Sequence, residues 1–180
     1  MPIKRCVILI DGSNFYFKLK DLKLHNLLDF DFSSFALKLA EKDKIIHATY
    51  YTGKIRTDGT RHTQRLFDNQ RKLLAHLRKH NFNYSLGYLL KSDGKFHEKG
   101  VDVNIAVDIL VAAYENICDR IIIVSSDTDL LPAVKKAKEK KKIIEYVGFS
   151  HMRSHALINN CSKYTLLTKK DLLPFVKTKK

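Results

Sequence analysis

Short runs of apolar, mostly β-branched residues recur along the chain and predict the strands of a sheet. Residues 7–10 (VILI) and 121–124 (IIIV) are apolar without interruption, which is typical of parallel strands buried on both faces. Further strands are predicted at residues 45–52, 82–90, 143–147 and 164–167. The two uninterrupted runs are expected to lie at the centre of the sheet.

The segments between these runs carry apolar residues at helical spacing. Helices are predicted at residues 32–42, 61–80, 101–116, 130–141 and 154–160, and a polar loop at residues 91–100. Strands that alternate with helices imply an α/β fold, with a mostly parallel sheet covered on both faces. No repeat or linker interrupts the pattern, so residues 1–170 are expected to form one domain. Residues 171–180 are expected to add a last helical turn or a basic tail.

The charge of the chain points to a polyanionic partner. Lys and Arg number 33 against 19 Asp and Glu, which gives a formal net charge of +14 in 180 residues. Such an excess favours nucleic acid or an acidic membrane surface, although lysine-rich surfaces also serve only to keep proteins soluble. No apolar stretch approaches the roughly 20 residues of a membrane span, and the N-terminal run is too short for a signal peptide. We therefore expect a cytoplasmic protein.

Aspartates follow the two most apolar runs. Asp11 comes directly after residues 7–10, and Asp127 follows residues 121–124 after two serines, with Asp129 two residues further on. In open parallel sheets the ligand site lies beyond the carboxyl ends of the strands. Aspartate is also a favoured helix N-cap, and for Asp129 alone capping is the better interpretation. For Asp11 and Asp127 together a shared acidic site is favoured.

Asp102 is a third candidate for this site. It falls in the first turn of the helix predicted at residues 101–116, where the helix dipole favours a carboxylate whatever the function. The apolar residues expected to pack this helix on the sheet are Val103, Ala106, Val107 and Leu110. Asp108 lies about 240° further round the helix, so it is a weak candidate that could approach another part of the site or bond a neighbouring loop.

A cluster of carboxylates needs a cation, because like charges raise one another's pKa values. Hard oxygen ligands select Mg²⁺ or Mn²⁺ over zinc. The histidines are scattered, and Cys6, Cys118 and Cys161 are expected to be buried, reduced thiols without metal-type spacing. One or two hard metal ions could activate a water for attack on a phosphodiester.

Three segments together resemble the signature blocks of NYN domains, in the LabA-like branch of the PIN-like ribonuclease superfamily. They are VILIDGSNFY at 7–16, KGVDVNIAVDIL at 99–110 and IIIVSSDTDLLPAVKKAKEKKK at 121–142. The segment SHAL at 154–157 and the following YTL at 164–166 are similar to the end of such domains. Each block is short, but their combination and order are specific, and the resemblance covers nearly the whole chain.

The resemblance implies a three-layer α/β/α Rossmann-like sandwich with metal-dependent ribonuclease chemistry. It implies that Asp11, Asp102 and Asp127 are metal ligands and that Asp129 is a fourth acidic member of the catalytic set. Asn14 matches the asparagine that follows the first strand in the family. It could fix Asp11 or contact a phosphate, and capping the next helix is equally plausible.

Several polar and basic side chains are candidates for substrate binding. Arg61, Arg65 and Lys72 share one face of the helix predicted at residues 61–80, opposite its leucines. Such a ridge is most often a solvated surface, but it could also follow the phosphates of RNA. Lys99 is the preferred phosphate contact because it is close to Asp102 in sequence. Ser126 is a further candidate for contact with the substrate, although its hydroxyl and that of Ser125 are expected to hold their loop in place.

Two functions remain after this comparison. The leading prediction is hydrolysis of single-stranded or structured RNA by metal-activated water, and the alternative is a non-catalytic nucleic-acid-binding or regulatory module on the same fold. An aspartyl phosphatase is disfavoured because Ser13 stands where a second aspartate is usual. A dinucleotide-binding domain is disfavoured because the first strand-to-helix turn has no glycine fingerprint. The sequence is also compatible with a homodimer.

Overall fold

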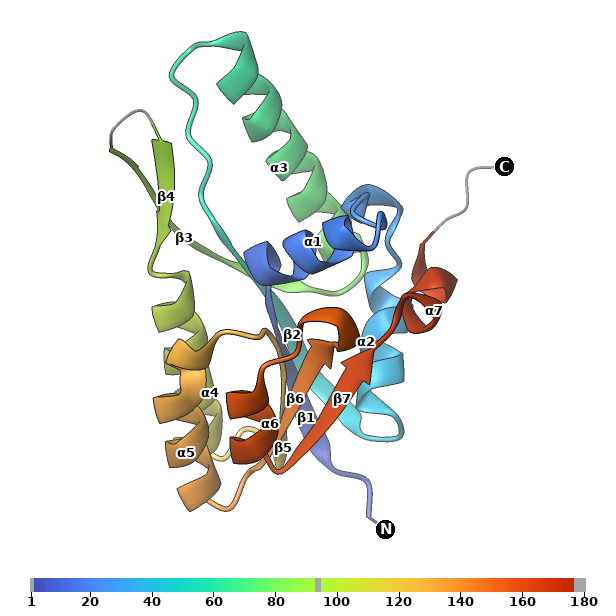
Figure 1. Cartoon of the computed structure of the whole chain (residues 1–180). Coiled ribbons are helices and arrows are strands. Elements are labelled where there is room, and N and C mark those ends of the chain that lie inside the picture. Colours follow the sequence, from blue (N-terminus) through green and yellow to red (C-terminus); the bar gives the residue numbers. More distant parts are fainter. Residues whose placement is uncertain (1, 93–94, 177–180) are drawn as a thin grey trace.

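Seven strands form one sheet in the order β4-β3-β2-β1-β5-β6-β7 (Figure 1). The structure, a computed structural model, describes residues 2–92 and 95–176, with side chains described outside 89–98. All neighbouring strands are parallel except β3 and β4. The strands are β1 (Arg5–Asp11), β2 (Lys44–Gly53), β3 (Asn83–Ser92), β4 (Lys95–Lys99), β5 (Arg120–Val124), β6 (Ile143–Phe149) and β7 (Lys163–Leu167).

Helices cover both faces of this sheet, so the predicted α/β/α sandwich is confirmed. They are α1 (Gly12–Asp21), α2 (Phe32–Ala40), α3 (Arg61–Lys79), α4 (Val101–Tyr114), α5 (Leu131–Glu139), α6 (His155–Asn160) and α7 (Lys169–Leu172). In β1, Ile8 and Ile10 face the core formed with α1, α2, α3 and α7. Val7 and Leu9 face the core formed with α4, α5 and α6. Because both faces are covered, the middle of this strand, residues 7–10, has to be apolar.

The direction in which the sheet grows changes between β1 and β5. The chain runs outward from β1 through β2 and β3 to β4, then returns through α4 to place β5 on the other side of β1. This change of direction opens a crevice at the carboxyl ends of the two strands, which is where open α/β sheets bind ligands. Asp11 ends β1 at this crevice.

The segment predicted as a polar loop at residues 91–100 forms a strand instead. β3 continues to Ser92, and β4 pairs with it antiparallel, with Tyr88 opposite Lys99. A charged edge strand needs little apolar character, so the usual strand signal is missing. Gly100 then has a φ of 80°, a left-handed conformation that suits glycine, and leads into α4.

The face of α4 that packs on the sheet was predicted only in part, because Ala106 and Leu110 pack against the buried cluster but the two valines do not. Val103 and Val107 are exposed, with 64% and 49% of their surface accessible, while Ile105 and Ile109 are fully buried. Apolar residues surround this helix on nearly all sides, so their spacing does not identify the buried face.

Of the segment 171–180, residues up to 176 pack on the sandwich. A short 3-10 turn, Leu173–Phe175, follows α7. The ring of Phe175 is buried and lies 5.5 Å from the ring of Phe35. Residues 177–180 of the predicted basic tail lie outside the described part of the chain. Within that part, no helix has the length and apolar character needed to cross a membrane.

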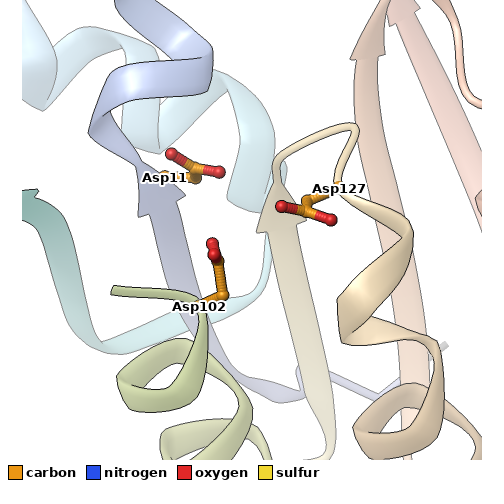
Figure 2. Close-up of side chains that lie close together, drawn as sticks. All are labelled: Asp11, Asp102 and Asp127. Atoms are coloured by element: carbon orange, nitrogen blue, oxygen red, sulfur yellow. The ribbon is translucent and has the colours of Figure 1, made fainter. Parts of the chain in front are cut away.

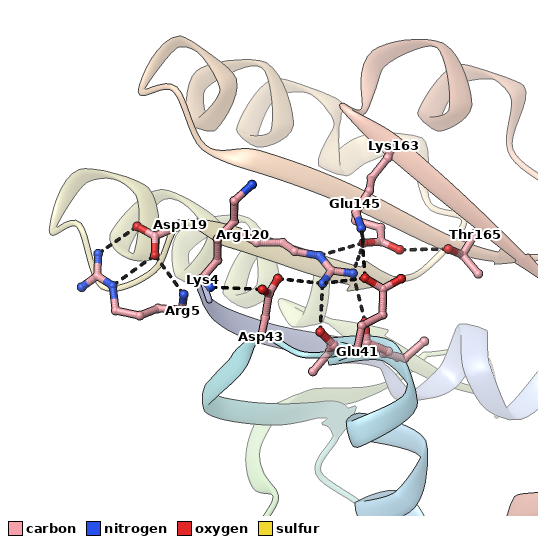
Figure 3. A network of polar contacts seen from close by, with 11 residues as sticks. Lys4, Arg5, Glu41, Asp43, Asp119, Arg120, Glu145, Lys163 and Thr165 are labelled. Carbon is pink, nitrogen blue, oxygen red and sulfur yellow. Dashed lines mark hydrogen bonds and ion pairs between the residues drawn. The ribbon is translucent and has the colours of Figure 1, made fainter. Parts of the chain in front are cut away.

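A buried network of ion pairs lies near the amino ends of the strands, at the opposite end of the sheet from the crevice (Figure 3). The guanidinium of Arg120 donates to the carboxylates of Glu145 and Asp43, at 2.9 Å in each case. It also donates to the carbonyl oxygens of Leu39 and Ala40. Burial raises the pKa of Asp43, but hydrogen bonds from Arg120 and from a backbone N–H outweigh this effect and hold the pKa below its ordinary value.

Candidate active site

Three carboxylates from distant parts of the chain converge at the crevice between β1 and β5 (Figure 2). Asp11 ends β1, Asp102 lies in the first turn of α4, and Asp127 lies in the loop between β5 and α5. Each offers an oxygen, and these oxygens all lie within 4.8 Å of one another. The structure thus brings together three of the four aspartates predicted for the site.

Asp11 is held by hydrogen bonds to both of its oxygens. It is 5% exposed. Its Oδ1 accepts from the backbone N–H of Asn14 at 3.0 Å, which caps α1, and its Oδ2 accepts from the hydroxyl of Ser125 at 2.8 Å. The Asp11 side chain therefore both caps α1 and belongs to the acidic cluster, and these hydrogen bonds fix its orientation.

Ser125 links two of the three acidic residues. Its buried hydroxyl donates to Asp11 and accepts from the backbone N–H of Asp127 at 3.1 Å. Asp127 in turn accepts from the backbone N–H of Asp129 at 2.9 Å. The side chain of Asp129 is exposed and lies outside the cluster of three.

The oxygen donors of this cluster fit a hard divalent cation. The surrounding cavity of about 300 Å³ is lined by Asp11, Ser13, Asn14, Phe17, Val101, Asp102 and Asp127. None of these lining residues carries a positive charge. Three carboxylate oxygens within 4.8 Å of one another are of the kind that Mg²⁺ and Mn²⁺ prefer as ligands.

The cysteines do not compete for such a metal. All three are free, and Cys6 and Cys118 are buried. Burial raises the pKa of the Cys6 and Cys161 thiols to about 11, so both are protonated at neutral pH.

Asn14 and Ser126 join α1 to the loop after β5. The side-chain oxygen of Asn14 accepts from the backbone N–H of Ser126 at 3.3 Å. The Ser126 hydroxyl lies 3.0 Å from the hydroxyl of Tyr146. These contacts, with those of Ser125, show the serine hydroxyls tying down the loop as predicted. Asn14 also lines the acidic cavity.

The predicted basic contacts lie outside the acidic cavity itself. Arg61, Arg65 and Lys72 are exposed along α3, where they line a shallow groove of about 650 Å³. Lys99 is exposed at the end of β4, just before α4. Helix α3 and the β3–β4 hairpin both project from the end of the molecule at which the strands finish (Figure 1).

Asp108 serves the packing of α4 rather than the cluster. It accepts a hydrogen bond of 2.6 Å from the hydroxyl of Tyr51, a buried residue of β2. Burial, followed by this hydrogen bond, raises the pKa of Tyr51 above its ordinary value. Asp108 is therefore not one of the converging carboxylates.

Phe17 lines the acidic cavity but was not predicted as a site residue. Its side chain is 58% exposed although Phe15, two residues earlier, is fully buried. Three consecutive aromatic residues in one helix cannot share one buried face. The three consecutive aromatic residues in the sequence therefore indicated that at least one ring in this part of the chain is exposed.

Ser125→Ala is expected to weaken binding of a divalent cation to the three carboxylates about 10- to 100-fold, the usual range for a group that orients a metal ligand. The substitution removes the donor to Asp11 and the acceptor for the Asp127 N–H. Calorimetric titration with Mn²⁺ measures this loss of affinity. Ser125→Thr, which keeps the hydroxyl, should recover much of the loss, and equal loss in both variants would contradict this role.

Comparison with known proteins places the chain in a family. The family model for the NYN domain matches residues 5–168. No curated protein matches the sequence. A solved protein of unknown function from Vibrio parahaemolyticus is 23% identical, with a TM-score of 0.70 over 92% of this chain and 93% of that chain. It has the same fold.

Two solved structures of bacteriophage T5 nucleases are more distantly similar. One is a flap endonuclease in complex with DNA and metal ions, 15% identical, with a TM-score of 0.47 over 86% of this chain and 59% of that chain. The other is a 5'-exonuclease with bound zinc, 16% identical, with a TM-score of 0.45 over 86% and 60%. These scores are too low to transfer any property to this chain. The match of the family model over most of the sequence shows that the chain belongs to the NYN domain family.

Proposed function

We propose that the protein is a ribonuclease that hydrolyses RNA phosphodiester bonds and depends on Mg²⁺ or Mn²⁺. The observation that carries this proposal is the convergence of Asp11, Asp102 and Asp127 at the crevice between β1 and β5. A packed domain does not need three carboxylates within 4.8 Å of one another, and their mutual repulsion disfavours folding unless a cation compensates it. The NYN family membership supports the same chemistry.

The three carboxylates have different surroundings and hence different roles. Asp11 is the fixed member, because both of its oxygens accept hydrogen bonds from the protein. Asp102 and Asp127 are more exposed and complete the cation site. A divalent cation bound there would supply Lewis acidity at the scissile phosphate and activate water. Asp129, exposed beyond Asp127, is proposed as the outer acidic member.

The positive surface would draw RNA to this acidic site. A net charge of +14 provides long-range attraction. The basic ridge, defined as Arg61, Arg65 and Lys72 on α3, lines an open groove that suits contacts with phosphates. Lys99 lies three residues before Asp102 and is proposed as the phosphate contact on the other side.

Replacing all three residues of the basic ridge by alanine is expected to weaken binding of single-stranded RNA at least about tenfold at 0.1 M salt. The slope of log affinity against log salt should become shallower by about 2, because each phosphate contact with a single strand contributes roughly 0.7. Fluorescence anisotropy of a labelled RNA over a range of salt concentrations measures both quantities.

A triple variant on α5 is the matched control, because it removes the same charge from the opposite layer. Lys135, Lys136 and Lys138 are exposed there, and their replacement by alanine should leave the slope near its wild-type value. Equal effects of the two triple variants would mean that net charge alone, and not the basic ridge, determines RNA binding.

Incubation with RNA tests the proposed activity. The wild-type protein would be mixed with single-stranded RNA, hairpin RNA and single-stranded DNA, each in Mn²⁺, in Mg²⁺ and in chelator. We expect RNA products in at least one metal and none in chelator. Salt-sensitive binding without products in any metal would contradict the proposal and favour a non-catalytic nucleic-acid-binding module.

A further inference from the structure

A larger cavity adjoins the acidic site and plays no part in the chemistry described so far. It has a volume of about 540 Å³ and lies between α1, α3, the end of β2 and residues 25–28. Ser13 and Phe17 line both this cavity and the acidic one. The two spaces are therefore neighbours, and a molecule bound to the carboxylates lies next to the larger cavity.

The same cavity also adjoins the basic ridge. Asn69 of α3 lines it and lines the groove of Arg61, Arg65 and Lys72 as well. The cavity thus lies between the acidic site on one side and the cationic face of α3 on the other. A nucleic-acid strand that touches both of these would place the nucleotide between them at this cavity.

The lining is neutral and aromatic, which suits a base rather than a phosphate. No Asp, Glu, Lys or Arg is found among the described residues that line it. The ring of Phe17 is exposed and lies 5.6 Å from the ring of Tyr16, which in turn lies 5.9 Å from His25. Leu66, partly exposed, faces the cavity from α3. Exposed rings of this kind stack on bases of single-stranded nucleic acid.

Polar groups at the cavity divide into fixed and available ones. Gln70 is fixed, because its side chain accepts from the N–H of Ile55 and donates to the carbonyl of Gly53. Asn69 is exposed, and its side chain makes no hydrogen bond to the fully described residues 2–88 and 99–176, so its amide can meet the edge of a base. The volume falls within the roughly 300–1,000 Å³ of small-molecule sites.

We propose that this cavity is a base pocket, which holds one unpaired base next to the phosphate at the acidic site. The inference rests on the proposed ribonuclease function and adds to it a substrate class. A base enters the pocket only if it is free of its pairing partner and its stacked neighbours, so the protein selects single-stranded over duplex RNA. Phe17 is the stacking residue, and Asn69 contacts the edge of the base.

Phe17→Trp gives a direct reporter, because the chain contains no tryptophan. The variant would be combined with Asp127→Asn to prevent cleavage and titrated with three probes of equal length. These are a single-stranded RNA, the same RNA with one abasic position placed in turn along the strand, and a fully paired duplex. We expect strong quenching by the first, loss of quenching at one abasic position, and binding without quenching by the duplex.

Phe17→Ala is the complementary variant and is expected to fold, since the ring is 58% exposed. Its affinity for the single-stranded RNA, measured by anisotropy in the same Asp127→Asn background, should fall about 5- to 150-fold, the range for loss of one stacked base. Tyr164→Ala removes a ring of similar exposure on β7 and is the control; it should bind like the parent.

The outcomes separate the base pocket from the proposed activity. Phe17-dependent binding and quenching support the pocket even if the wild-type protein cleaves no RNA. Cleavage by the wild type, with equal affinity of the Phe17→Ala and Tyr164→Ala variants and no quenching, overturns the pocket and leaves the nuclease intact. Quenching by duplex as strong as by single strands also overturns it.

Discussion

Asp127→Asn is expected to lower metal-dependent RNA cleavage by more than about 100-fold, since loss of a residue that merely orients a metal ligand already costs about 10- to 100-fold. The amide still has an oxygen to accept the N–H of Asp129, a bond that is 2.9 Å long in the native loop. The loop should therefore keep its structure while the cluster loses one charged ligand. Initial cleavage rates over a range of Mn²⁺ concentrations provide the measurement.

RNA binding and a distant acidic residue are the controls for this variant. Affinity for RNA in chelator should stay the same or rise, because a negative charge has been removed. Glu115→Gln neutralises an exposed carboxylate at the far end of α4, the helix that also carries Asp102, and should cleave like the wild type. Cleavage by Asp127→Asn at the rate of Glu115→Gln would contradict the proposed role of the cluster.

Arg120→Ala is expected to destabilise the fold by about 3–5 kcal/mol, the usual cost of breaking a buried ion pair by removing one partner. Arg120 is 2% exposed. Its removal takes the guanidinium from the buried carboxylate of Glu145, which keeps Lys163 as an ion-pair partner. It also leaves the carbonyl oxygens of Leu39 and Ala40 without their donor (Figure 3). Urea unfolding followed by circular dichroism at 25 °C measures the change.

A neighbouring arginine gives the matched control. Arg5 pairs with Asp119 at 3.0 Å, but both side chains are more than 40% exposed. Arg5→Ala should therefore cost under about 1 kcal/mol. Arg120 lies at the amino end of β5, whereas the acidic cluster lies at the carboxyl ends of the strands. RNA cleavage by Arg120→Ala should therefore persist under strongly native conditions. Equal destabilisation by the two variants would show that the buried network contributes little.

The central strands and the acidic cluster could be predicted from the sequence for the same physical reason. The middle of a strand that is covered on both faces is usually apolar, so residues 7–10 and 121–124 are easily recognised as central strands. A polar residue directly after such a run lies at the carboxyl end of the strand. Asp11 and Asp127 were found in this way. Asp102 could be placed in a first helical turn, and its convergence with the other two followed from the family resemblance.

Other features depend on packing that periodicity does not encode. The buried face of α4 was predicted only in part because apolar residues surround the helix, and the edge strand β4 was missed because it is charged. Arg120 and Glu145 lie one in each of two neighbouring strands, and nothing in the sequence indicates that both are buried. The base pocket depends on α1 and α3 lying side by side, which becomes visible only in the folded chain.

A crystal structure of the protein grown with MnCl₂ tests the central claim most directly, because manganese is located by its anomalous scattering. We predict a peak within about 2.0–2.4 Å of carboxylate oxygens from Asp11, Asp102 and Asp127, the range expected for oxygen ligands of such ions. The peak should vanish in crystals of Asp127→Asn. Ordered carboxylates with no manganese among them at millimolar MnCl₂ would contradict the account.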